Sequence, residues 1–385
     1  MARRFNLKTL LQKTSVNLLL QYLNSRDIPV EFKSHEPGKV KPAVIFKAWA
    51  KISDSKRAEL EVELRQIYFL ATEKGEKALI LAAAQQGEDL APVLTGLKNY
   101  YDRAIFACLK RPAYWNDALR LLTVENTPPR YWRKRRNIPK NPALTDAENI
   151  GRFQRAIGDY FHQKEGLGEN CHVDYFKKKE IDQFIAYPED YARTGNAWVG
   201  NKFKRHPCTP AFEVFFVYSE KEGTLDINFP GNRWVIPDLQ EIFAEIILGT
   251  NIGPEKKDVK VFDLAPLKQK GFQFVYGPTD GVKSVKVRKL RITNNYDNSS
   301  LQFEGANPLK EMYKVFNGAG ANAYTLSDYD VTKAQFEVRF DPNLGPANKN
   351  KYVFTVTCPN SCTLGYFDGR ESIIRKMLTD SGLER

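Results

Sequence analysis

The sequence predicts an α+β protein, with a helical N-terminal domain followed by a domain of antiparallel β-hairpins with packed helices. Through residues 1 to about 125, apolar residues recur every three or four positions, as on the buried face of a helix. From residue 211 onward, short β-type segments come in pairs, and each pair precedes a helical segment. The chain has 385 residues, more than a single core usually supports, so we expect at least two domains.

Residues 1–127 are predicted to form an all-helical domain. One helical face is made by Leu60, Leu64, Ile67, Tyr68 and Ala71. The next long segment repeats this spacing with Leu90, Leu94, Leu97 and Tyr101. A first helix is predicted to turn Leu10, Leu11, Leu18, Leu19 and Tyr22 toward the core. Gly75, Gly87 and Pro112 punctuate these helices.

The N-terminus superficially resembles a twin-arginine signal, but Lys8, Gln12 and Lys13 interrupt any apolar stretch, so we expect an ordinary first helix. An organellar presequence is the alternative. No apolar run reaches the roughly 18–20 residues that a membrane span needs. The five cysteines are scattered and odd in number, which is unlike a disulfide framework. We therefore expect a soluble cytoplasmic protein without a membrane or disulfide-linked partner.

Residues 128–142 interrupt the helical pattern with a basic segment rich in proline and arginine. Its four prolines exclude a continuous helix. The segment is predicted to be a linker or an ordered loop, and we place the main domain boundary there.

Residues 143–385 are predicted to form the α+β domain. Thr145 and Glu148 form a capping box that begins a helix over 145–161. Residues 162–210 look irregular and are rich in aromatic residues and prolines. Residues 211–385 then contain three hairpin–helix units, with helices expected near 238–248, 308–316 and 370–380.

The positive charge is unevenly distributed along the chain. The net charge is +12, and residues 1–127 and 128–207 each carry an excess of +6, whereas residues 208–385 are neutral. Charge concentrated in one part of a chain favours a polyanionic partner.

The basic segment and a second cluster downstream are the candidate nucleic-acid-binding residues. The first set interleaves cations with aromatic residues: Arg130, Tyr131, Trp132, Arg133, Lys134, Arg135, Arg136 and Lys140. The second set is Lys202, Lys204 and Arg205, beside Phe203. Guanidinium groups bind phosphate and aromatic rings stack on bases. We therefore expect a nucleic-acid-binding protein, acting as a subunit of a larger assembly with a possible protein partner. The alternative reading of the cluster is a solvated linker or internal ion pairs.

Phosphate-binding loops and the common nucleophile motifs are absent from the sequence. An enzymatic alternative is a metal-dependent nuclease or related hydrolase that uses Glu213, Asp226 and His162 with a divalent ion. His162, Cys171, His206 and Cys208 are weak candidates for zinc ligands, and buried cysteines with edge histidines in an aromatic-rich region are the favoured explanation of the same residues. No other cofactor is expected. A protein-interaction scaffold is the third alternative. Lys283, Lys286, Arg288 and Arg291 alternate along a predicted strand, and we interpret them as a solvated sheet face.

Overall fold

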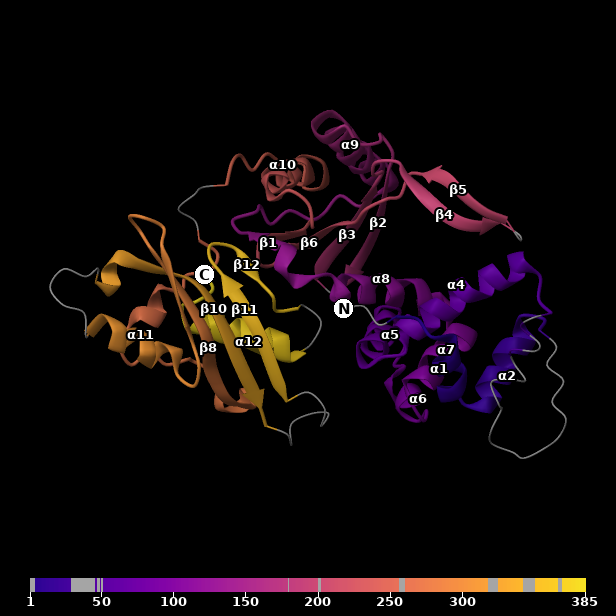
Figure 1. The fold of residues 1–385 in the computed structure, drawn as a ribbon, viewed down its shortest axis with the longest axis horizontal. Coiled ribbons are helices and arrows are strands. Elements are labelled where there is room, and N and C mark those ends of the chain that lie inside the picture. Colours follow the sequence, from indigo (N-terminus) through magenta and orange to yellow (C-terminus); the bar gives the residue numbers. More distant parts are fainter. Residues whose placement is uncertain are drawn as a thin grey trace. The chain divides into compact units, whose positions relative to one another are not determined.

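The computed structural model describes residues 4–28, 46, 49, 51–178, 180–199, 202–255, 260–317, 325–341, 350–365 and 369–385. These residues form an α+β protein with two five-stranded antiparallel sheets and a separate two-stranded hairpin (Figure 1). The chain divides into two compact units. Met1–Thr127 and Thr194–His206 form the first unit, and Pro128–Arg193 and Pro207–Arg385 form the second.

The first unit is built from helices and one exposed hairpin. Its helices are α1 (Leu7–Lys13), α2 (Val16–Ser25), α4 (Asp54–Leu70), α5 (Glu73–Gln85), α6 (Ala91–Thr95), α7 (Tyr100–Lys110), η1 (Pro112–Tyr114) and α8 (Trp115–Asn126). The predicted apolar face from Leu60 to Ala71 is buried, which confirms the helical periodicity. The hairpin consists of β4 (Arg193–Val199) and β5 (Lys202–Cys208).

Two predicted helices are each divided in two. The first breaks between α1 and α2, where the buried carboxylate of Asp102 accepts hydrogen bonds from the Ser15 amide (2.6 Å) and hydroxyl (2.5 Å). The segment from Leu90 to Tyr101 breaks between α6 and α7 because the Asn99 side chain accepts from the amides of Tyr101 and Asp102 and begins a new helix. In both places, a polar side chain satisfies amides that a continuous helix would bond internally.

Gly75 lies inside α5, where the sequence suggested a helix break. A Cβ atom at this position would lie 2.0 Å from the carbonyl oxygen of Leu70. The glycine therefore allows α5 to start close against the end of α4.

The first sheet of the second unit has the strand order β1-β7-β6-β3-β2. Its strands are β1 (Trp132–Arg135), β2 (Cys171–Lys178), β3 (Ile181–Pro188), β6 (Val214–Ser219) and β7 (Thr224–Asn228). Helices α9 (Ala147–Glu165) and α10 (Ile236–Ile247) pack on one face, with η2 (Pro129–Tyr131) before β1 and η3 (Arg233–Val235) before α10. The core between these layers joins Phe153 of α9, Phe216 of β6 and Phe243 of α10.

Two expectations for this region are wrong. Residues 132–135 are not part of a linker or loop, because they form the edge strand β1, paired with β7 from Trp132↔Asn228 to Arg135↔Leu225. Residues 162–210 are not irregular, because they complete α9 and contain β2 to β5. Alternation failed as a signal here for a physical reason: β3 is almost entirely buried, whereas β4 and β5 are mostly exposed on both faces, so neither pattern alternates.

The second sheet has the strand order β12-β11-β10-β8-β9. Its strands are β8 (Val282–Asn294), β9 (Ser300–Glu304), β10 (Tyr329–Phe340), β11 (Lys351–Thr357) and β12 (Ser361–Cys362). Its helices are α11 (Pro308–Asn317) and α12 (Gly369–Asp380), with single turns η4 (Ala265–Lys268), η5 (Pro278–Asp280) and η6 (Leu326–Asp328). Met312 of α11 and Ile374 of α12 join the same core as Phe336 of β10. The elements after residue 211 thus run hairpin–helix three times: β6-β7-α10, β8-β9-α11 and β10-β11-α12.

Two further features concern the whole chain. None of the helices in the described part is long and apolar enough to cross a membrane. All five cysteines have free thiols.

Candidate nucleic-acid interface

The basic segment 128–142 is built into the second unit, and part of its charge is buried there. Lys134 is only 4 % exposed. Its ammonium Nζ lies 3.8 Å from Asp226 Oδ2 on β7 and 3.3 Å from Glu384 Oε1 near the C-terminus. A guanidinium nitrogen of Arg375 on α12 lies 3.6 Å from the same Glu384 oxygen. Lys134 therefore belongs to a buried ion network that joins the two sheets.

Arg135 and Arg133 are also occupied by the protein itself. Arg135 is 6 % exposed and donates to the carbonyl oxygens of Ile252 (3.0 Å) and Gly253 (2.7 Å), and burial lowers its pKa. Arg133 donates to the backbone carbonyl oxygen of Trp132 (2.8 Å) and to the hydroxyl of Ser361 on β12 (3.1 Å). The hydrogen bonds of these two side chains go to groups of the protein itself, so few of their donors remain for an external phosphate.

The remaining cations of this segment are more accessible. Arg130 and Lys140 are exposed, and Arg136 is half-buried. The Arg130 guanidinium stacks on the half-buried ring of Tyr131, with its carbon 4.6 Å from the ring centroid. Trp132, in contrast, is buried and packs against Phe215. Of the eight predicted residues, those on β1 are mostly buried, whereas Arg130 and Lys140 outside the strand are accessible.

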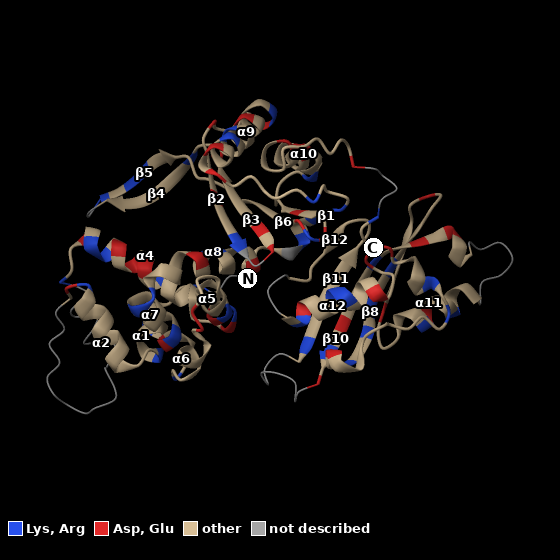
Figure 2. Cartoon of the chain, turned by 180° about the vertical axis from the view of Figure 1, so that it is seen from behind, with Lys and Arg blue, Asp and Glu red and all other residues tan. Residues whose placement is uncertain are grey.

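The β4–β5 hairpin carries the other predicted cluster, and there the cations are exposed. Lys202, Lys204 and Arg205 all lie on β5 and all are exposed. Figure 2 marks Lys and Arg positions on this hairpin in blue. No Asp or Glu occurs between Asp190 and Glu213, so no neighbouring acid in the sequence neutralises them.

Aromatic rings accompany these cations. Trp198 on β4 is 72 % exposed, and Phe203 on β5 is 49 % exposed. Their ring centroids lie 5.6 Å apart in an edge-to-face arrangement. The guanidinium of Arg205 lies over the Phe203 ring, 5.7 Å from its centroid. Large apolar side chains are normally buried, so an exposed aromatic pair with cations is a candidate contact surface.

The two faces of the hairpin differ in chemistry. Side chains alternate across a strand, so Phe203 and Arg205 lie on one face of β5 and Lys202 and Lys204 on the other. The ring contact places Trp198 with Phe203. One face therefore offers rings for stacking, and the other offers ammonium groups. Trp198 is not among the site residues predicted from the sequence. The signal that could have identified it is its position in a stretch without acids, from Tyr191 to Phe212, close to the cations of β5.

The three weak catalytic candidates are not brought together. Asp226 lies between Leu225 and Ile227, whose side chains face α9 and α10, so its own side chain lies on the opposite face of the sheet from His162 of α9. Glu213 precedes β6, four residues from Val217, the register partner of Asp226, or about 13 Å along the strand. Asp226 is moreover neutralised by Lys134. Asp226 is also buried, with only 3 % of its surface exposed.

The candidate zinc ligands are likewise not gathered. No group of three or more His, Cys, Asp or Glu residues suited to a metal ion occurs in the described ranges. The His162 ring interacts through Nδ1 with the Leu167 carbonyl oxygen (2.6 Å) and through Nε2 with Glu169 (3.3 Å). Cys171 lies in β2, where burial raises the pKa of its thiol to about 12. His206 and Cys208 lie on β5.

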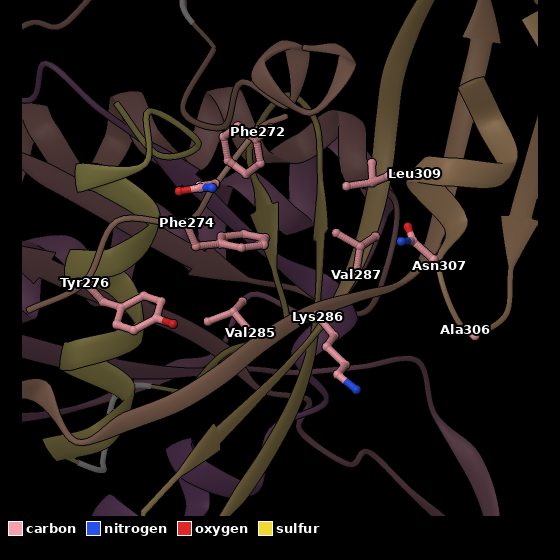
Figure 3. A pocket seen from close by; sticks show the side chains of 10 residues that line it. Phe272, Phe274, Tyr276, Val285, Lys286, Val287, Ala306, Asn307 and Leu309 are labelled. Atoms are coloured by element: carbon pink, nitrogen blue, oxygen red, sulfur yellow. The ribbon is translucent and has the colours of Figure 1, made fainter. Parts of the chain in front are cut away.

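The second unit has a pocket of about 450 Å³ between the loop before η5, β8 and the start of α11 (Figure 3). Its lining consists of Phe272, Gln273, Phe274, Tyr276, Val285, Lys286, Val287, Ala306, Asn307 and Leu309. None of these is an acid, a histidine or a cysteine, and Figure 3 shows the Lys286 side chain extending away from the aromatic rings. The residues that line the pocket therefore include no carboxylate, imidazole or thiol to bind a metal ion, and its ionisable side chains are Tyr276 and Lys286.

A larger pocket, of about 870 Å³, lies in the first unit between residue 5, α4, α5 and α8. Arg65 covers the ring of Phe5 at its wall, 4.7 Å from the centroid. The rings of Tyr68 and Phe69 also line it.

The sequence matches no protein-family model and no curated protein.

Proposed function

We propose that the chain binds nucleic acid and that the β4–β5 hairpin is the main contact element. The observation that carries this proposal is the exposed pair Trp198 and Phe203 on a hairpin whose charged residues are all cations. Aromatic rings stack on any base and cations follow the phosphates, which is how proteins bind single strands without sequence preference. Binding of this kind weakens steeply with salt.

The exposed cations of the basic segment add to this proposal. Arg130 and Lys140 are exposed, whereas Lys134 and Arg135 are committed to internal partners. We therefore assign Arg130 and Lys140 a secondary role in binding and assign the buried pair to stability.

The proposal extends to location and partners. Five free thiols fit a reducing compartment, which supports a cytoplasmic protein. A protein partner for the helical unit would make the chain a subunit, and stoichiometric co-purification tests that part of the proposal.

The proposal is tested by anisotropy of a labelled single-stranded 20-mer over a salt series. In the variant Lys202→Ala/Lys204→Ala/Arg205→Ala, the slope of log affinity against log salt is expected to fall by up to about 2, because each phosphate contact contributes about 0.7. In Trp198→Ala/Phe203→Ala, binding is expected to weaken by roughly 1–3 kcal/mol per stacked base, about 5- to 150-fold in Kd, with the slope retained.

A matched control removes three exposed lysines of the same unit, two on α1 and one between α6 and α7: Lys8→Ala/Lys13→Ala/Lys98→Ala. This control lowers the net charge by the same amount and is expected to bind like the wild type. Equal loss in the control variant would show that net charge alone drives binding, and wild-type affinity in both hairpin variants would refute the assignment of the hairpin.

A further inference from the structure

The second sheet of the second unit is covered by helices on one face. Met312 of α11 and Ile374 of α12 both pack on the face that carries Phe336 and Val338 of β10. Residues that alternate with these point to the other side of the sheet, which we call the outer face. Figure 3 shows this alternation on β8, where Lys286 points away from Val285 and Val287.

The outer face is strongly cationic. Residues 286–291 of β8, 333–339 of β10 and the start of β11 lie side by side in register, as Lys286↔Glu337 and Arg339↔Lys351 illustrate. Figure 2 shows Lys and Arg residues along β8 and β10. The outward cations on this span, besides Lys289, are Lys286, Arg288, Arg291, Lys333, Arg339 and Lys351. Lys289 is balanced by Glu304 of β9, at 2.8 Å.

A single carboxylate organises the centre of this face. Glu337 is 5 % exposed and lies within 2.7 Å of Arg288, 2.7 Å of Arg339 and 3.1 Å of Lys351. One negative charge thus holds three cations, which leaves an excess of two positive charges at a fixed position. The pairing also limits the side-chain motion of the three cations, so less entropy is lost when they meet a ligand.

Two further cations flank this cluster. Lys286 and Lys333 are exposed, and neither has an ion-pair partner within the described part of the chain. Arg291 is half-buried and directs Nε to the Thr332 hydroxyl at 3.4 Å. The neutral positions of the face are hydroxyls, amides and one valine, such as Thr355, Gln335 and Val353, with no aromatic ring on the span described above.

This composition selects the kind of ligand. A face with cations and hydroxyls but no rings suits phosphate oxygens and offers nothing on which an unpaired base can stack. Duplex nucleic acid presents phosphates at high density, one negative charge per roughly 1.7 Å of helix axis, with its bases already stacked. The hairpin has the opposite character, because its exposed rings suit unpaired bases.

We propose that the outer face of the second sheet, centred on the Glu337 cluster, binds the phosphate backbone of a nucleic-acid duplex. This inference rests on the proposed function and deepens it. The chain then has two chemically distinct contact surfaces, a stacking hairpin for unpaired bases and a cationic sheet for duplex.

The test compares a labelled 20-base-pair duplex with a single-stranded 20-mer across a salt series, using the full chain. The face variant is Lys286→Gln/Lys333→Gln, which removes two cations without breaking an ion pair of the described residues. The control is Lys310→Gln/Lys314→Gln, two exposed lysines on α11, which packs on the helix-covered side of the same sheet. Circular dichroism and thermal unfolding verify that both variants fold.

For the face variant, the duplex slope is expected to fall by about 2, since each duplex contact contributes about 0.9. At 0.1 M salt, the same relation gives roughly an eightfold loss of duplex affinity per contact. Single-strand affinity should stay near the wild-type value in both variants. Unchanged duplex binding in the face variant, an equal loss in the α11 control, or a wild type that binds only single strands overturns the inference. The proposed function fails only if the wild-type protein does not bind the single-stranded 20-mer. The failure of the inference and the failure of the proposed function are therefore distinguishable.

Discussion

At the scale of the residue, Lys134 shows how a charge that looks available in the sequence is committed in the fold. Its ammonium lies between Asp226 and Glu384 at the junction of the two sheets. Removing one member of a buried ion pair leaves the remaining charges unpaired and typically costs about 3–5 kcal/mol. Lys134→Ala is therefore expected to lower the free energy of unfolding by that amount, measured by urea denaturation. Lys140→Ala, at an exposed site of the same segment, should change it by less than about 0.5 kcal/mol.

Glu337 supplies the pH-dependent prediction. Its hydrogen bond from Arg339, with the nearby Lys351, lowers the pKa of its carboxyl from 4.5 to about 2. A depressed carboxyl pKa contributes stability that is present above pH 4.5 and is lost as the pH falls through about 2. Glu337→Gln should therefore destabilise the protein at pH 6, and the difference from the wild type should shrink by pH 2. A difference that is constant from pH 6 to pH 2 would contradict this role.

At the scale of the element, the β4–β5 hairpin contributes contact surface and little core. Both strands are mostly exposed along their length. Replacing residues 194–206 with a short Gly-Ser loop should leave the thermal midpoint within a few degrees of the wild type, because none of the side chains described in 194–199 and 202–206 is fully buried. The same change should abolish most single-strand binding. A large drop in the thermal midpoint would show that the hairpin has a structural role.

The elements also show what the sequence could predict. The helical face from Leu60 to Ala71 and the strands β8 and β11 follow from periodicity, because those elements have one buried and one exposed face. Strands β6 and β7 are buried along their whole length, so they could be predicted only from their β-type residues. Strand β3 has no exposed face, and β4 and β5 have hardly a buried one, so alternation could not reveal them. The partners of Lys134 lie 92 and 250 residues away in the chain, and no local pattern contains that information. Cations could be located from sequence, but their burial could not.

At the scale of the whole molecule, the two units each have their own buried residues. In the first, Leu64, Leu79 and Leu121 are almost fully buried, and the second has a core beneath each sheet. A fragment of residues 1–127 is therefore expected to fold alone and to show helical circular dichroism with cooperative unfolding. A fragment that remains unfolded in dilute buffer would show that the first unit depends on the rest of the chain.

The meeting of β1 and β12 has a consequence for self-association. The amide of Lys134 on β1 donates to the carbonyl oxygen of Asn360, next to β12, at 3.0 Å, so the end strands of the two sheets shield each other's backbone. Unpaired sheet edges attract strands of other molecules and promote aggregation. The junction removes two of the four edges that two separate sheets would expose, leaving β2 and β9 as the outer strands. A chain truncated before Asn360 would uncover β1, and it should form intermolecular β-structure more readily than the intact protein.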